Sequence, residues 1–261
     1  MKDIRNTVFI LPNLFTSANL IMGLLAITYV IRDEPNFKLA SLAILAAMFF
    51  DVFDGLVARL TRTISRFGIE YDSLSDCVSF GVAPAIMMYM YRAKEYTHDD
   101  LPFLQFAFIA YAVFATLRLA RFNSQVETTD SKNFSGIPTP AAAGAIISYF
   151  LVLKGKSSFL TDSLIYLHSL TIFDRWWLPL YSMFLGFLMI STIKFPAPAK
   201  SIVWKRHPFS LLVLLVALIA ITVIFKEDSL FCLFNGYIFY GLIRWILQRL
   251  RIIKEKTPEL A

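Results

Sequence analysis

The sequence predicts an all-α membrane protein, a polytopic bundle of about eight transmembrane helices with a short interfacial helix before the first. Of its 261 residues, 57% are hydrophobic and only 17% are charged, whereas a soluble domain has about 25% charged residues. Apolar runs close to the roughly 20 residues that cross a bilayer as a helix recur along the chain. Lys and Arg stand singly or in pairs at the ends of these runs. This pattern excludes a water-soluble globule and gives no reason to expect a nucleic-acid partner.

The expected elements follow in order along the chain. Residues 1–11 carry Lys2 and Arg5 beside apolar side chains, which predicts an interfacial helix that ends at Pro12. The fifth and seventh spans are the shortest of those that follow. The eight expected spans are 13–31, 38–60, 72–91, 102–122, 137–153, 175–193, 208–225 and 229–248.

The loops indicate an orientation. An even number of spans puts both termini on one side of the membrane, and the loops of that side hold most of the 25 Lys and Arg residues. Because cytoplasmic loops carry the excess of Lys and Arg, we expect both termini to be cytoplasmic.

Four carboxylates lie where the second and third spans meet at a cytoplasmic hairpin. An Asp near the centre of a spanning helix costs about 2.5 to 3.5 kcal/mol, so four of them need compensation. Spacings of three and four residues put each pair on one face of its helix. Hard oxygen ligands in this number suit Mg²⁺ or Mn²⁺, with room for two ions. These residues are Asp51, Asp54, Asp72 and Asp76.

The alternative for these acids is helix capping or ion pairing with nearby arginines such as Arg59. Against it, Gly55 and Ala58 share the face of Asp51 and leave space between the helices. A divalent cation in a cytoplasm-facing membrane cavity typically handles phosphates, and Arg59 offers a further phosphate contact. The pattern therefore favours phosphate chemistry.

The run from Asp51 to Arg59 (DVFDGLVAR), followed by Gly68, Asp72 and Asp76, resembles the signature of the CDP-alcohol phosphotransferases. That family transfers the phosphatidyl group of a CDP-lipid to an alcohol and releases CMP. The resemblance implies a homodimer with two Mg²⁺ or Mn²⁺ ions, and by default a bacterial cytoplasmic (inner) membrane with the active site facing the cytoplasm. It implies that Asp51, Asp54 and Asp72 bind the metals, that Asp76 completes the site and deprotonates the alcohol, and that Gly55, Ala58, Arg59 and Gly68 bear on the CDP moiety.

Further segments within about the first 155 residues resemble the phosphatidylserine synthases of this family. They are PNLFTSAN at 12–19, RLARFN at 118–123 and FSGIPTP at 134–140. The resemblance implies CDP-diacylglycerol and L-serine as substrates, and a catalytic core over 1–155 followed by additional spans over 156–261. We assign Thr16 and Asn19 to CDP-lipid contacts, with a helix-start role as the alternative. The residues expected in the acceptor pocket are Arg118, Arg121, Asn123 and Thr139.

Two other functions are alternatives to the transfer of a phosphatidyl group to serine. A sister enzyme would use the same chemistry on glycerol 3-phosphate, an inositol phosphate or choline. A secondary transporter or ion channel would also carry intramembrane acids, but it predicts acids spread near the membrane midplane and weak inverted symmetry. The four acids here gather around one hairpin.

Overall fold

The computed structural model describes residues 2–61, 63, 65–93, 101–126, 134–153, 171–195 and 208–250. Within these residues the chain is helical apart from short connections and one pair of two-residue strands. The elements are α1 (Lys2–Ile31), α2 (Phe37–Leu60), α3 (Arg66–Asp76), the π-helix η1 (Cys77–Val82), α4 (Ala83–Arg92), α5 (Leu101–Val126), β1 (Phe134–Ser135), α6 (Thr139–Leu153), α8 (Thr171–Ile190), β2 (Lys194–Phe195) and α10 (Pro208–Arg249).

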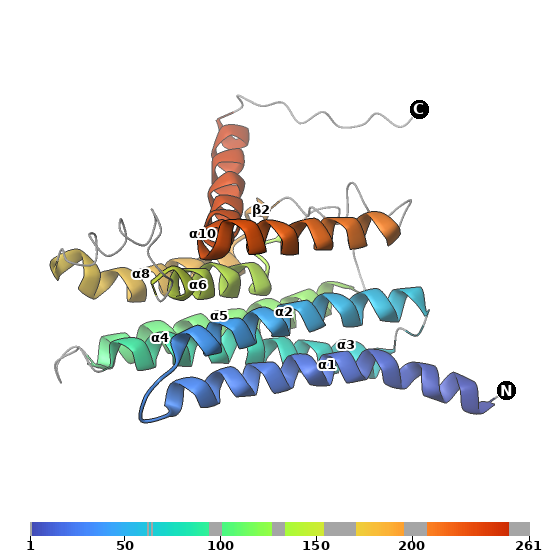
Figure 1. Cartoon of the computed structure of the whole chain (residues 1–261). Coiled ribbons are helices and arrows are strands. Elements are labelled where there is room, and N and C mark those ends of the chain that lie inside the picture. The colour runs from blue at the N-terminus through green and yellow to red at the C-terminus, as the bar shows by residue number, and fades with distance from the viewer. Residues whose placement is uncertain are drawn as a thin grey trace.

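The helices pack in two groups (Figure 1). α1 lies along α2 and also contacts α3, η1 and α4, whereas α5 packs against α8 and α4. α6 contacts α2 on one side and α10 on the other. The N-terminal helices therefore form one layer and α6, α8 and α10 cover it.

The helix break expected at Pro12 is absent, and that prediction is wrong. α1 runs from Lys2 to Ile31 with Pro12 inside it. A proline removes one backbone N–H, but ending a helix in apolar surroundings would leave several backbone groups without partners. Continuing the helix through Pro12 therefore costs less free energy than ending it there.

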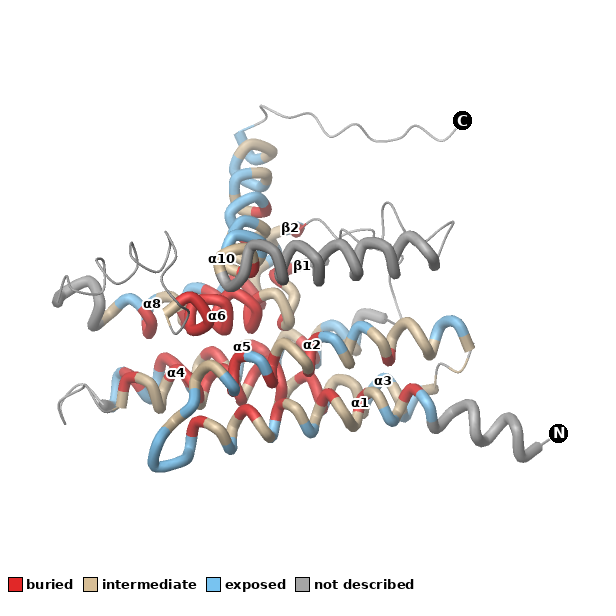
Figure 2. Tube along the Cα trace, viewed as in Figure 1, coloured by how far each residue is buried: buried red, intermediate tan, exposed pale blue. Residues whose placement is uncertain are grey.

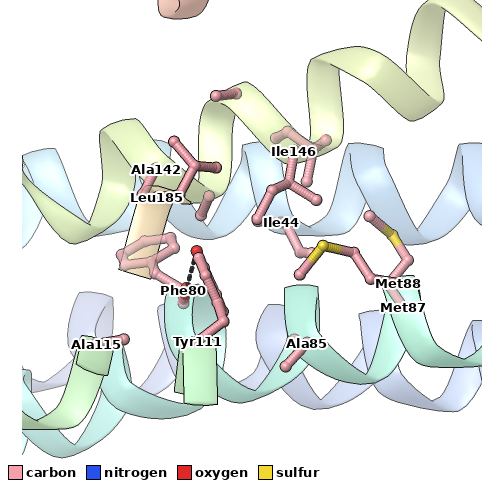
Figure 3. Packing of buried hydrophobic residues seen from close by; sticks show 14 of the residues in the cluster. Ile44, Phe80, Ala85, Met87, Met88, Tyr111, Ala115, Ala142, Ile146 and Leu185 are labelled. Atoms are coloured by element: carbon pink, nitrogen blue, oxygen red, sulfur yellow. Dashed lines mark hydrogen bonds between the residues drawn. The ribbon is translucent and has the colours of Figure 1, made fainter. Parts of the chain in front are cut away.

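The third span begins at Arg66, six residues before the expected start, because Ser65 caps α3. Its side chain accepts a hydrogen bond of 3.0 Å from the Gly68 N–H, which is a typical helix N-cap. The backbone then continues without a break through η1 into α4. Pro84 has no N–H for the Phe80 carbonyl four residues earlier, and the Tyr111 hydroxyl donates to that carbonyl at 3.0 Å (Figure 3).

α6 is the central helix of the bundle. Its residues from Ala142 to Val152 are all buried, as Figure 2 shows, and a helix that is apolar all round belongs in a core. Ile146 of α6 packs near Ile44 of α2, and Ala142 lies near Leu185 of α8 (Figure 3).

The two strands were not expected from the sequence. β1 pairs antiparallel with β2 through Phe134 and Phe195, which joins the chain before α6 to the chain after α8. Gly136 has φ +80°, and a Cβ there would collide with the Met189 carbonyl. A glycine is needed both for the backbone conformation and for this close approach.

Among the described residues, five helical segments are long and apolar enough to cross a membrane. They are Leu11–Ile31, Phe37–Leu60, Arg66–Arg92, Pro102–Ser124 and Asp228–Arg249, with Thr139–Leu153 and Trp176–Ile190 as shorter apolar helices. The helix α10 is continuous from Pro208 to Arg249, so the loop expected between 225 and 229 is absent, but the two halves of α10 lie at a wide angle to one another (Figure 1). Large apolar side chains such as Phe106, Ile109 and Phe239 are about 60% exposed, as expected for faces in contact with lipid. The chain is an all-α multi-pass membrane protein, while the number of spans and the position of the termini stay predictions.

Candidate active site

Two helices bring the acidic residues together. Asp51 of α2 and Asp72 and Asp76 of α3 each place a carboxylate oxygen within 4.8 Å of the others. Asp54 lies one turn along α2, is 5% exposed, and interacts with Asp72. Three of the four acids therefore form one cluster in space, and Asp54 lies outside that group of three but adjoins it through Asp72.

The cluster fits a divalent cation. Like charges at such distances repel strongly when they are removed from water, so a bound cation or a shared proton has to offset the repulsion. Asp72 Oδ1 and Asn19 Oδ1 are buried and have no hydrogen-bond partner among the described residues. Unpartnered carboxylate and amide oxygens are the ligands that Mg²⁺ and Mn²⁺ prefer. The cluster therefore meets the requirements of a divalent-metal site.

α1 holds two of the acids in place. Thr16 Oγ1 donates to Asp54 Oδ2 at 2.9 Å, and Asn19 Nδ2 donates to Asp76 Oδ1 at 3.0 Å. Both side chains belong to a buried stripe that continues through Gly23, Ala26 and Val30, at the spacing of one helix face. The residues assigned from the sequence to CDP-lipid contacts thus bond directly to the acids.

Two serines complete the contact between α1 and the third span, and the sequence reasoning missed them. Ser75 Oγ donates to the Thr16 carbonyl at 3.1 Å, and Ser79 Oγ donates to the Asn19 carbonyl at 3.0 Å. Gly23 lets α1 approach, because a Cβ at this position would overlap Ser79. The signal was the four-residue spacing of these serines beside Asp72 and Asp76, which places them on adjoining faces of one helix.

A pocket of about 220 Å³ opens beside the acids. Arg59 and the beginning of α3 lie on its wall, and the N-terminus of a helix attracts anions. Gly55 leaves room for the Arg59 side chain on this wall, since a Cβ at position 55 would lie 3.0 Å from Arg59 Nη2. The lining residues are Pro12, Asn13, Thr16, Asp54, Gly55, Ala58, Arg59, Thr63, Ser65, Gly68, Ile69 and Asp72.

The pocket therefore collects all four residues expected to bear on the CDP moiety, together with two of the acids. Asn19 is not among its lining residues, because its side chain turns to Asp76. A cation, a helix N-terminus and small side chains beside a metal-type cluster suit a diphosphate with its attached group.

The four residues expected in the acceptor pocket separate into two groups. Arg118 Nη1 donates to Thr139 Oγ1 at 2.6 Å, and the guanidinium lies within electrostatic range of Asp76 and Asp51. Arg121 Nη1 instead donates to the Ile190 carbonyl at 3.0 Å, at the end of α8.

Asn123 exchanges hydrogen bonds with Ser73 of α3 at 3.0 and 3.1 Å. The structure thus joins Thr139 to Arg118, which interacts with Asp76 and Asp51, whereas Arg121 and Asn123 join neighbouring helices. Acceptor roles for the latter two stay predictions.

The fold and the site define a class: a multi-pass membrane protein with a carboxylate cluster of the divalent-metal type beside an anion-binding pocket. Residues 9–177 match the CDP-alcohol phosphatidyltransferase family. The chain belongs to this family, as its acidic signature indicated.

Relatives extend the similarity over nearly the whole chain. A CDP-diacylglycerol-serine O-phosphatidyltransferase of Helicobacter pylori (strain J99) is 33% identical over 97% of this chain and 98% of the relative. One of Methanocaldococcus jannaschii is 32% identical over 94% and 98%, respectively. An archaetidylserine synthase of Methanothermobacter thermautotrophicus is 41% identical over 58% of this chain and 62% of its own length.

Proposed function

We propose that this chain transfers the phosphatidyl group of CDP-diacylglycerol to the hydroxyl of L-serine and releases CMP. The observation that carries the proposal is the near full-length similarity to relatives that bear this enzyme name. The names of these relatives refer to different lipids, phosphatidyl in one and archaetidyl in the other, but both names contain serine. We therefore favour serine as acceptor over glycerol 3-phosphate, an inositol phosphate or choline.

The pocket beside the acids takes the CDP part of the lipid substrate. Arg59 holds the diphosphate with its N–H groups, and the N-terminus of α3, which Ser65 caps, adds its positive end. Gly55, Ala58 and Gly68 leave room for the nucleotide on the same wall. The diphosphate is thereby held next to Asp54 and Asp72, which line the same pocket.

Asp76 takes the proton in the transfer step. The serine oxygen bonds to the β-phosphorus, the bond from that phosphorus to the bridging oxygen breaks, and CMP leaves with the electron pair. The hydroxyl proton passes to the Asp76 carboxylate, which Asn19 orients through its 3.0 Å hydrogen bond. Bound at Asp51, Asp54, Asp72 and Asp76, two Mg²⁺ or Mn²⁺ ions would neutralise the diphosphate and stabilise the departing CMP.

The proposal includes the setting of the enzyme. The acidic hairpin and both termini face the cytoplasm at the inner membrane, and the protein acts as a homodimer. Residues 1–155 form the catalytic core, and residues 156–261 add further spans to the same membrane domain. The support for this orientation is the excess of Lys and Arg in the loops on the side of the hairpin.

The test is a purified-enzyme assay with CDP-diacylglycerol and Mn²⁺, in which each alcohol is offered in turn and CMP release is followed. L-serine should support release and yield phosphatidylserine, identified by mass spectrometry. Asp76→Asn should abolish turnover and still bind the CDP-lipid. Release with another alcohol and none with serine would assign a sister enzyme. Metal-independent solute flux in proteoliposomes without CMP release would favour a transporter.

A further inference from the structure

A buried serine joins α1 to the third span just beyond the acids. Ser79 is fully buried, and its Oγ donates to the Asn19 carbonyl at 3.0 Å. Gly23, one turn further along α1, lies against the same serine, because a Cβ on Gly23 would overlap Ser79 Oγ and stand 2.8 Å from Ser79 Cα. Ser79 therefore fixes how closely α1 approaches the third span at the level of Asn19.

Asn19 connects this serine to the acid cluster. Its backbone carbonyl accepts the hydrogen bond from Ser79, and its side-chain Nδ2 donates to Asp76 Oδ1 at 3.0 Å. Asn19 and Asp76 are both buried, so little water can replace either hydrogen bond. Asp76 shares its cluster with Asp51 and Asp72. Two successive hydrogen bonds therefore lead from Ser79 through Asn19 to a carboxylate of the site.

The π-helix η1 carries Ser79. α3 ends at Asp76, and η1 begins at the next residue. Its turns are wider than those of an α-helix, since the Ala83 N–H bonds to the Val78 carbonyl five residues earlier. Short π segments inside helices occur frequently at functional sites. Because Asp76 and Ser79 belong to one continuous backbone and both bond to Asn19, the three residues close a ring across the two helices.

A second helix, α5, also holds η1. The Tyr111 hydroxyl of α5 donates to the Phe80 carbonyl at 3.0 Å (Figure 3), and both side chains are fully buried or nearly so. Gly81 lets α5 come close, since a Cβ on Gly81 would lie 3.2 Å from Ala115 Cβ. η1 is thereby bonded to α5 as well as to α1, which gives the Ser79 hydroxyl a defined place relative to Asn19.

We infer that Ser79 is a positioning residue, which holds Asn19 so that the Asn19 amide keeps the Asp76 carboxylate in place for the proton of the acceptor hydroxyl. The inference deepens the proposed function and rests on it, because it takes Asp76 as the group that accepts this proton. A general base has to lie within hydrogen-bonding distance of the proton that it takes, and a displacement of about 1 Å can cost as much as about 100-fold in rate. Ser79 touches no substrate and acts through Asn19.

The test is the Ser79→Ala variant, which removes the hydroxyl and adds no bulk. At saturating Mn²⁺ the kcat for CMP release with L-serine should fall about 3- to 10-fold, the effect of losing one neutral hydrogen bond, while the KM for each substrate stays within about twofold of wild type. In an Asn19→Ala background the same substitution should change kcat by less than about twofold, because the side chain through which Ser79 acts is then absent. Ser148→Ala is the matched control, since it removes a buried hydroxyl that bonds to the Ala145 carbonyl of its own helix and should leave kcat unchanged.

A purely structural role for Ser79 would lower kcat by the same factor in both backgrounds, or would lower the thermal midpoint and leave kcat unchanged. Either result overturns the inference.

A second measurement needs no substrate. Because Asp76 belongs to the acid cluster, Mn²⁺ binding to the purified protein, followed by electron paramagnetic resonance, should weaken about 3- to 10-fold in Ser79→Ala. It should keep its wild-type strength in Ser148→Ala. Equal Mn²⁺ affinity in Ser79→Ala and wild type would contradict the inference. If wild-type enzyme released no CMP with serine, the proposed function itself would fail, and the comparison of Mn²⁺ binding would still test whether Ser79 positions Asp76.

Discussion

Thr16→Val should weaken the metal dependence of the enzyme without unfolding it. The Thr16 hydroxyl lies 2.9 Å from Asp54 Oδ2 and 3.2 Å from the Pro12 carbonyl, and it has one proton to donate. The shorter distance and the charge of the carboxylate favour Asp54 as the acceptor. Valine has nearly the shape of threonine, so the substitution removes this hydrogen bond and little else.

The size of the effect follows from the burial of Asp54, which is 5% exposed. Little water can reach it to replace the lost donor, so the ionised carboxylate loses about 1.5 to 3 kcal/mol of stabilisation. Because a metal ligand has to be ionised, this cost appears in metal affinity. At about 1.4 kcal/mol per factor of ten, the Mn²⁺ concentration for half-maximal CMP release should rise about 10- to 150-fold.

The assay is a Mn²⁺ titration of CMP release by purified enzyme at saturating CDP-diacylglycerol and serine. Thr16→Ser keeps the hydroxyl and should stay close to wild type. Thr28→Val is the matched control on the same helix, because the Thr28 hydroxyl only bonds the Leu25 carbonyl on an exposed face. A Thr16→Val enzyme with the metal dependence of wild type would refute the reasoning, since the proton would then go to the Pro12 carbonyl.

Three further predictions concern the fold and the metal. Gly136→Ala should lower the midpoint of thermal unfolding in detergent, because φ +80° costs an alanine about 1 to 2 kcal/mol and its Cβ would strike the Met189 carbonyl. Tyr111→Phe should cost about 1 to 3 kcal/mol in the same measurement, since the buried Phe80 carbonyl loses its 3.0 Å donor. Removal of divalent cations with EDTA should abolish CMP release, and added Mg²⁺ or Mn²⁺ should restore it in wild type but not in Asp72→Asn.

Control variants separate the two stability predictions from a general effect of substitution on the stability of the protein. Gly236→Ala adds a Cβ where nothing lies within 4 Å and should leave the midpoint unchanged. Tyr240→Phe removes an exposed hydroxyl and should also be neutral. A Gly136→Ala or Tyr111→Phe protein as stable as wild type would contradict the packing argument, and CMP release that persists in EDTA would contradict a metal-dependent site.

The acids could be found from the sequence because their arrangement is local. Asp51 and Asp54 share a helix face, as do Asp72 and Asp76, and a short connection forces the two helices to be neighbours. Gly55 and Arg59 follow on the same helix, so a pattern of spacings places them beside the acids. The structure puts these residues around one cluster and one pocket.

Other parts of the site depend on contacts that no local pattern contains. Thr16 and Asn19 bond to acids 38 and 57 residues away, and Arg118 bonds to Thr139, which lies 21 residues further along the chain. The break expected at Pro12 was wrong because a rule for proline drawn from soluble helices neglects the cost of exposing backbone groups to lipid.

The sequence by itself determined the membrane setting, the helical class, the acidic signature and hence the family, since composition and short-range spacing depend only on neighbours along the chain. Only the tertiary structure decided which donors hold the acids and that β1, before α6, pairs with β2, after α8. The physical reason is that hydrogen bonds and close packing between helices depend on rotation and depth within a few tenths of an ångström. A one-dimensional pattern does not specify those quantities.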